Sequence, residues 1–165
     1  MHFSKTLFGL AASAAAVNAA TVTFWTLDDV ERTVYFTPSP GSPETEPVTV
    51  SNKENTTVTF PDVYRGNFYA VQQGQENKPG MLGEVAFGGF GGLTFFDVSA
   101  IVDPSDHGNV KQMWPANEAG PMSGCEHFPC DNAYWLPDDV QTKTAHTADL
   151  MTTLGKGSTG VAFTK

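Results

Sequence analysis

Two alternating apolar runs joined by a glycine-rich segment, within residues 81–103 (MLGEVAFGGFGGLTFFDVSAIVD), constrain the fold of this chain more than any other feature. In both runs apolar residues alternate with polar or small ones, and an alternation of period two is typical of β-strands. The glycines of residues 88–92 can adopt a positive φ without a Cβ clash, so the chain can reverse direction between the runs. We therefore predict an antiparallel hairpin at the centre of the fold.

Three acidic residues accompany this hairpin: Glu84 in the first run, Asp97 in the second, and Asp103 just after it. Because side chains alternate along a strand, Asp97 points away from the face that carries Phe96. An ionised carboxylate in an apolar interior costs on the order of several kcal/mol unless it is paired. Two interpretations therefore stay open: Asp97 lines an open groove, or it anchors a neighbouring loop by accepting hydrogen bonds from backbone N–H groups.

Short β-like runs separated by proline, glycine and polar turns make up the rest of the chain. The alternation predicts strands at residues 21–26 and 30–37, which we interpret as a first hairpin, and at residues 48–51, 56–60, 67–73, 148–154 and 161–163. Residues 104–123 show no periodicity and are predicted as a long loop. No apolar stripe at helical spacing persists beyond about one turn. We therefore predict an all-β fold, an antiparallel β-sandwich with few or no helices.

The first residues of the chain have the pattern of a secretory leader. Lys5 precedes an apolar, alanine-rich stretch at residues 7–17, and small side chains stand at Val17 and Ala19. This pattern predicts a signal peptide over residues 1–19 and a single domain over residues 20–165. No later segment reaches the roughly 18 apolar residues that a membrane span needs. We expect a secreted protein, in the extracellular space or the cell wall, without a membrane partner.

The charge of the chain is strongly acidic, with 9 Lys and Arg against 18 Asp and Glu and a formal net charge of −9. An acidic surface repels phosphate backbones, and no cluster of Lys and Arg in the sequence offsets this repulsion locally. We therefore predict no passive binding to nucleic acid or to anionic membranes. A nuclease that balances its charge with a metal ion is not excluded by this argument.

The chain has two cysteines, Cys125 and Cys130, in the sequence CEHFPC. In an oxidising compartment a pair this close predicts a small-loop disulfide. A zinc site would need two more soft ligands nearby, and His127 alone inside the loop is weak support for one. Asn55 begins the sequon Asn-Thr-Thr among polar residues, which predicts a glycosylation site in an exposed turn.

Residues 103–107 place Asp103, Asp106 and His107 close together, with Asp97 a few residues before them. Oxygen-rich groups of this kind suit calcium or magnesium, but the spacing does not match an EF-hand loop. Asp-Pro-Ser-Asp is also an ordinary turn sequence. We favour the turn and predict neither a metal nor another cofactor.

Glu84 and Asp97 are the pair of residues that we consider the best candidate for a chemical function. If their runs are hairpin neighbours, the two carboxylates can face one groove, and paired carboxylates are what the hydrolysis of a glycosidic bond requires. The same pair can also bind sugar hydroxyls without chemistry. Tyr134, Trp135 and Trp114 offer faces on which a sugar ring can stack, or they fill the core near the disulfide. Binding is the inference that we favour.

Several motifs together resemble the thaumatin-like protein family, in particular its short, cysteine-poor fungal branch. They are GEVAF, then GGLTFFDVSAIVD, a later Trp-Pro, and CEHFPCDNAYWLPDD. The resemblance covers about residues 82–139 and is weak before residue 67, and the run FFDVSAIVD is its most specific part.

The resemblance implies a secreted β-sandwich with an acidic cleft that binds or attacks β-glucan, and a role in encounters between a fungus and its host. The family's cleft acids map onto Glu84, Asp97 and Asp103, and Arg65 is the candidate for the cleft arginine. The chain departs from the family pattern in three respects: one extra residue between the two aspartates, the absence of most disulfides, and a cysteine-rich second domain reduced to CEHFPC. A shortened cleft favours binding over hydrolysis.

These observations lead to one functional prediction with two alternatives. We predict a secreted, non-enzymatic protein that binds cell-wall polysaccharide, or acts as an effector recognised by a host extracellular protein, with Asp103, Tyr134 and Trp135 as binding residues. The first alternative is a glycoside hydrolase on the same fold, with Glu84 as the acid and Asp97 as the second carboxylate. The second is a metal-dependent nuclease that uses Asp97, Asp103, Asp106 and His107.

Overall fold

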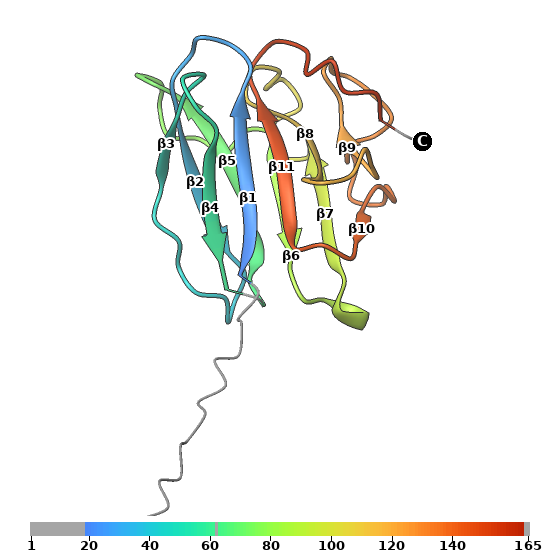
Figure 1. Ribbon diagram of the computed structural model, residues 1–165. Coiled ribbons are helices and arrows are strands. Elements are labelled where there is room, and N and C mark those ends of the chain that lie inside the picture. The colour runs from blue at the N-terminus through green and yellow to red at the C-terminus, as the bar shows by residue number, and fades with distance from the viewer. Residues whose placement is uncertain (1–18, 62, 164–165) are drawn as a thin grey trace, which may run out of the picture.

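The computed structural model describes residues 19–61 and 63–163, which form two β-sheets packed face to face (Figure 1). The first sheet has the order β4-β1-β11-β8-β9 and the second has the order β10-β7-β6-β5-β2-β3. The strands are β1 (Ala20–Thr26), β2 (Arg32–Pro38), β3 (Val48–Val50), β4 (Thr56–Phe60), β5 (Arg65–Gln72), β6 (Leu82–Ala86), β7 (Thr94–Ser99), β8 (Val110–Pro115), β9 (Ser123–Gly124), β10 (Lys143–Ala145) and β11 (Asp149–Leu154). A single 3₁₀ turn, η1 (Phe90–Gly92), is the one helical element of the described residues.

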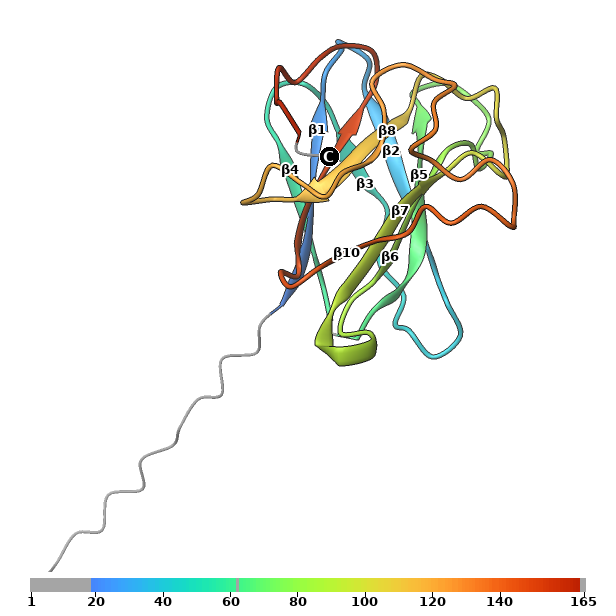
Figure 2. The same ribbon diagram turned by 90° about the vertical axis from the view of Figure 1, so that its right-hand side faces the viewer.

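The predicted all-β sandwich is confirmed. Figure 2 shows the sandwich from the side, with β1 and β4 in one layer and β5 and β6 in the other. The pairing departs from a purely antiparallel arrangement at one place, because β1 runs parallel to β11. No described helix is long and apolar enough to cross a membrane. The predicted signal peptide falls largely on residues 1–18, which lie outside the described residues.

Alternate residues of the strands form a common core between the two sheets. Phe24 of β1 contacts Phe68 of β5 edge to face, with 5.1 Å between ring centroids. Phe96 and Val98 of β7 and Leu150 of β11 are fully buried in the same cluster. Each such side chain stabilises the fold by roughly 1.5–3 kcal/mol through burial. The inward-facing half of each period-two pattern therefore holds the layers together.

The predicted central hairpin is also confirmed. Strands β6 and β7 pair antiparallel, and Glu84 lies directly opposite Asp97. The chain reverses through η1, where Gly91 and Gly92 have φ of 68° and 75°. A residue with a Cβ is strained in this left-handed region, so the glycine-rich sequence is what makes the tight reversal possible.

The predicted first hairpin is wrong, because β1 and β2 lie in different sheets. Strand β1 pairs with β4 and β11, whereas β2 pairs with β3 and β5. An alternation of period two identifies a strand with one covered face. Two consecutive strands show this alternation whether they pair in one sheet or lie in two sheets that face each other. The alternation alone therefore could not tell a hairpin from a connection between the layers.

The predicted long loop contains a strand that the sequence analysis missed. All six residues of β8 are buried, including Lys111 and Gln112, because loops and the C-terminal segment cover this strand. A strand buried on both faces loses the alternation that marks a half-exposed one. Residues 161–163, by contrast, are not a strand; Phe163 packs its ring against Trp114 at 5.1 Å between centroids.

Candidate functional site

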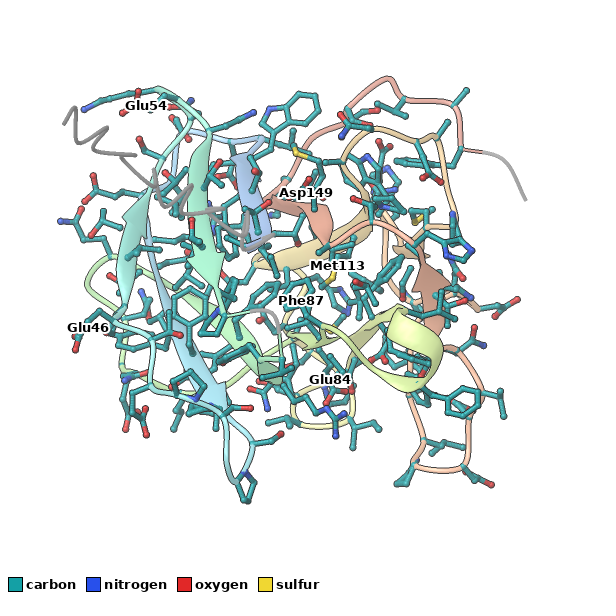
Figure 3. The ribbon with its side chains drawn as sticks, turned by 60° about the horizontal axis from the view of Figure 1, so that its bottom comes forward. Glu46, Glu54, Glu84, Phe87, Met113 and Asp149 are labelled. Carbon is teal, nitrogen blue, oxygen red and sulfur yellow. A yellow bond between two sulfur atoms is a disulfide. The ribbon has the colours of Figure 1, made fainter. Side chains whose placement is uncertain are left out.

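A row of polar side chains crosses four neighbouring strands of the second sheet. The strand register places Thr37 of β2 opposite Asn67 of β5, Asn67 opposite Glu84 of β6, and Glu84 opposite Asp97 of β7. Residues opposite each other in an antiparallel pair point to the same face. In Figure 3, Glu84 lies on the outer side of this sheet, whereas Phe87 and Met113 lie in the core. We call these four residues the polar row.

The polar row borders a surface groove of about 280 Å³. Glu84 and Asp97 line it together with Asn67, Arg65 and Phe95. Arg65 was the sequence-based candidate for a cleft arginine, and it lines the same groove as the two acids. The groove therefore offers carboxylate, amide and guanidinium groups, which can donate and accept hydrogen bonds to a polyhydroxylated ligand.

Asp97 is held in an unusual electrostatic environment. Its residue is only 7% exposed, Oδ2 accepts a hydrogen bond from Thr142 Oγ1 at 3.2 Å, and Oδ1 is buried without a partner among the described residues. Burial first, and then the charge of Glu84, raise the pKa of Asp97 to about 7, although the hydrogen bond from Thr142 opposes them. At neutral pH the carboxyl group of Asp97 therefore exists in both the protonated and the ionised form.

Tyr134 joins the site through Thr142. The Tyr134 backbone forms hydrogen bonds with Val98 O and Ala100 N, which fix it beside β7. Its hydroxyl lies 2.8 Å from Thr142 Oγ1, which in turn donates to Asp97. A threonine hydroxyl has a single proton, so Tyr134 is the donor to Thr142. The sequence analysis missed Thr142, because no motif marks a threonine in the loop before β10.

Trp135 does not reach the groove. Its indole N–H donates to Cys130 O at 2.7 Å, and its ring packs against Phe128 with 6.0 Å between centroids. The confirmed Cys125–Cys130 disulfide closes the small loop that carries Phe128. Trp135 thus attaches this loop to the core instead of offering a face to a ligand.

Asp103 lies apart from Glu84 and Asp97, in a turn that lines a different hollow. Its Oδ1 accepts hydrogen bonds from Ser105 N at 2.9 Å and Ser105 Oγ at 2.6 Å, and these bonds lower the pKa of Asp103. Asp106 Oδ2 accepts a hydrogen bond from Met81 N, and Oδ1 accepts one from Asn109. In residues 19–61 and 63–163, no group of three or more His, Cys, Asp or Glu residues is arranged to hold a metal ion.

Aromatic rings flank the polar row. On one side, Tyr35 of β2 and Tyr69 of β5 stand opposite each other and stack, with 5.5 Å between centroids and 22° between planes. On the other side, Phe95 lines the groove, and Phe90 in the η1 turn is 91% exposed. Polar groups between aromatic faces are a typical arrangement for holding a sugar chain. The sequence analysis did not identify these rings, because their alignment depends on strand order.

Comparison with known proteins identifies a close relative and solved structures of similar fold. The antigenic protein SchS21 of Stachybotrys chartarum is 66% identical over 144 residues, which cover 87% of this chain and 100% of that protein. The crystal structure of the protein elicitor MoHrip2 from Magnaporthe oryzae matches with a TM-score of 0.58 and 14% sequence identity, covering 83% of this chain and 99% of that one. At this identity the likeness shows a common fold. No family model matches the chain.

Proposed function

Because this chain belongs to the family of the antigenic protein SchS21, we propose that it is an exported protein that binds cell-wall polysaccharide, of the β-glucan class, through the groove of the polar row. The thaumatin-like assignment made from the sequence motifs stays part of this proposal. The single observation that carries the proposal is the register Thr37–Asn67–Glu84–Asp97, which aligns polar groups of four strands, and the last three of these residues line one groove.

The chemistry of the groove favours binding over hydrolysis. Glycosidases hold their two carboxyl groups roughly 5–5.5 Å apart when they retain configuration, and about 6.5–9.5 Å apart when they invert it. Here Asp97 is only 7% exposed and its Oδ2 accepts a hydrogen bond from Thr142 Oγ1, so little of this carboxyl group can reach a sugar carbon. A carboxyl pair with one proton can both donate to and accept from sugar hydroxyls.

Co-sedimentation with insoluble β-glucan tests the proposal. We expect the purified wild-type protein to bind and to release no reducing sugar. The isosteric variant Glu84→Gln and the truncated variant Tyr69→Ala are expected to bind roughly tenfold more weakly, since each removes a polar or stacking contact worth on the order of 1.4 kcal/mol. Asp138→Asn, at an exposed position away from the groove, is the matched control. Equal binding by all four proteins, or none by wild type, would refute the proposal.

One observation favours a hydrolase as the second candidate. An Asp97 with a pKa raised to about 7 carries the proton that a general acid needs at neutral pH. This assignment reverses the roles expected from the sequence, since Asp97 becomes the acid and Glu84 the second carboxylate. If the wild type releases reducing ends and Asp97→Asn does not, the protein is a hydrolase.

An elicitor-like role is compatible with polysaccharide binding. The relative is named an antigenic protein, and the solved structure of similar fold is a protein elicitor. We propose that this chain is likewise an effector encountered by a host extracellular protein. Application of purified wild type and Glu84→Gln to host tissue, with the oxidative burst as readout, tests whether the groove takes part.

A further inference from the structure

A further hollow, of about 210 Å³, is formed by residues other than those of the polar row, and two lysines, Lys111 and Lys156, are among the side chains that line it. It lies between the disulfide loop, the turn before β8, and the segment after β11. Figure 1 shows this last segment, in red, running beside the orange loop of the disulfide. The lining residues are His107, Lys111, Glu126, His127, Phe128, Lys156 and Gly157.

The burial of the Lys111 side chain is the central observation. Only 3% of this residue is exposed, and Nζ donates one hydrogen bond, to His107 O at 2.9 Å, while it lies 4.8 Å from the centroid of the Phe128 ring. The ammonium group has three donors. No carboxylate of the described residues lies within salt-bridge distance of it. A buried cation without a counter-charge is costly, so the hollow beside Lys111 is a favourable place for an anion.

The acids nearest to Lys111 are engaged elsewhere. Glu126 lines the hollow, but its Oε1 accepts hydrogen bonds from Ser158 Oγ at 2.6 Å and Thr159 N at 3.1 Å. Asp106 raises the pKa of Lys111 through its charge, yet burial outweighs it and lowers that pKa. Both Asp106 oxygens already accept hydrogen bonds from Met81, Gly108 and Asn109. Among the described residues Lys111 therefore forms no salt bridge, and two lysines line the hollow against one glutamate, Glu126.

The walls of the hollow are fixed in place. The disulfide Cys125–Cys130 constrains the loop that supplies His127 and Phe128. The backbone N–H of Lys156 donates to Asp28 Oδ2 at 2.9 Å, which fixes the position of the second lysine. A water molecule occupies roughly 30 Å³, so the hollow has room for a group the size of a small oxyanion.

We propose that this hollow is an oxyanion-binding site, which takes a phosphate or sulfate group, free or as a monoester, between Lys111 and Lys156. Lysine binds phosphate as a point charge, and the imidazole N–H of His127 can add a directional hydrogen bond. The net charge of −9 repels extended polyanions, so a small anion that fits the hollow is favoured over nucleic acid or an anionic membrane.

Isothermal titration calorimetry in chloride buffer tests the site, with inorganic phosphate, inorganic sulfate and a sugar phosphate as probes. We expect saturable binding of at least one probe, and binding at least roughly tenfold weaker in Lys156→Gln, because a charged hydrogen-bond donor is lost. Lys78→Gln is the control, since Lys78 is exposed and paired with Glu76 at 3.1 Å. A preference for the sugar phosphate over the inorganic ions identifies a monoester ligand.

Lys111→Met provides an independent check through thermal unfolding. Phosphate or sulfate is expected to raise the melting temperature of the wild type, and to leave that of Lys111→Met unchanged. If circular dichroism shows that Lys111→Met does not fold, the test rests on the calorimetric comparison of the wild type with Lys156→Gln. The absence of saturable binding by every probe, or equal binding by wild type and Lys156→Gln, would overturn the assignment. Neither result bears on the groove of the polar row.

Discussion

Asp97 shows how the environment of one residue couples pH to stability. Its pKa is raised from an ordinary value of 3.8 to about 7 in the fold, mainly by burial and then by Glu84, so the folded state binds a proton that the unfolded state releases. This contribution to stability is complete below about pH 4 and is lost as pH rises through about 7. We expect Asp97→Asn, which mimics the protonated form, to match the wild type near pH 4 and to be more stable near pH 8 by about 1–3 kcal/mol.

Urea unfolding of both proteins between pH 4 and 8 measures this difference. The comparison with Asp97→Asn isolates Asp97, because all other titrating groups are common to the two proteins. Asp138→Asn, at an exposed position, is expected to follow the wild-type curve throughout. A constant offset between the wild type and Asp97→Asn across this range would contradict the raised pKa of Asp97.

At the scale of a single element, strand β9 depends on Gly124. This residue has φ of 81°, pairs with Gln112 of β8, and leaves no space for a Cβ beside Lys111 O. We expect Gly124→Ala to reduce the free energy of unfolding by roughly 2–4 kcal/mol, since the added methyl group meets both backbone strain and a clash. Gly41→Ala is the matched control, because φ is 91° there but nothing lies within 4 Å of the added Cβ. Equal losses in the two variants, measured by urea unfolding, would show that strain alone accounts for the effect.

At the scale of the whole molecule, Arg32 connects the two sheets and the C-terminal segment. Its side chain is fully buried, donates to both Asp28 carboxylate oxygens at 2.6 and 2.8 Å, and reaches Asn109 and Gly108 before β8. Asp28 also accepts from the Lys156 backbone. Burial opposes ionisation of Asp28, but Arg32 and the backbone donors together lower its pKa. One ion pair therefore links β2, the turn after β1, the loop before β8 and the end of the chain.

Removal of this connection should destabilise the entire sandwich. We expect Arg32→Met to lower the free energy of unfolding by roughly 3–5 kcal/mol, because it leaves Asp28 partly buried without its counter-charge. Lys78→Met, which breaks the exposed pair with Glu76, should cost less than about 1 kcal/mol. Chemical denaturation of the two variants against the wild type provides the comparison, and similar small losses in both would show that Arg32 is dispensable.

The features that the sequence predicted correctly are local. Period two in residues 81–103, with glycines between the runs, was sufficient to predict the hairpin β6–β7. The register that places Glu84 opposite Asp97 was open in the sequence, because it depends on where the turn begins and ends. The five-residue separation of Cys125 and Cys130 was likewise sufficient for the disulfide. The all-β class followed from the absence of any helical stripe.

The three-dimensional fold was needed to show which segments meet across long sequence separations. It assigned β1 and β2 to different sheets, covered both faces of β8, and brought Thr142 to Asp97, Tyr35 beside Tyr69, and Lys111 beside Lys156. It also left Asp103 in a separate turn, although this residue follows β7 directly. Alternation indicates that one face of a strand is covered. Which segment covers that face depends on the packing of the complete core.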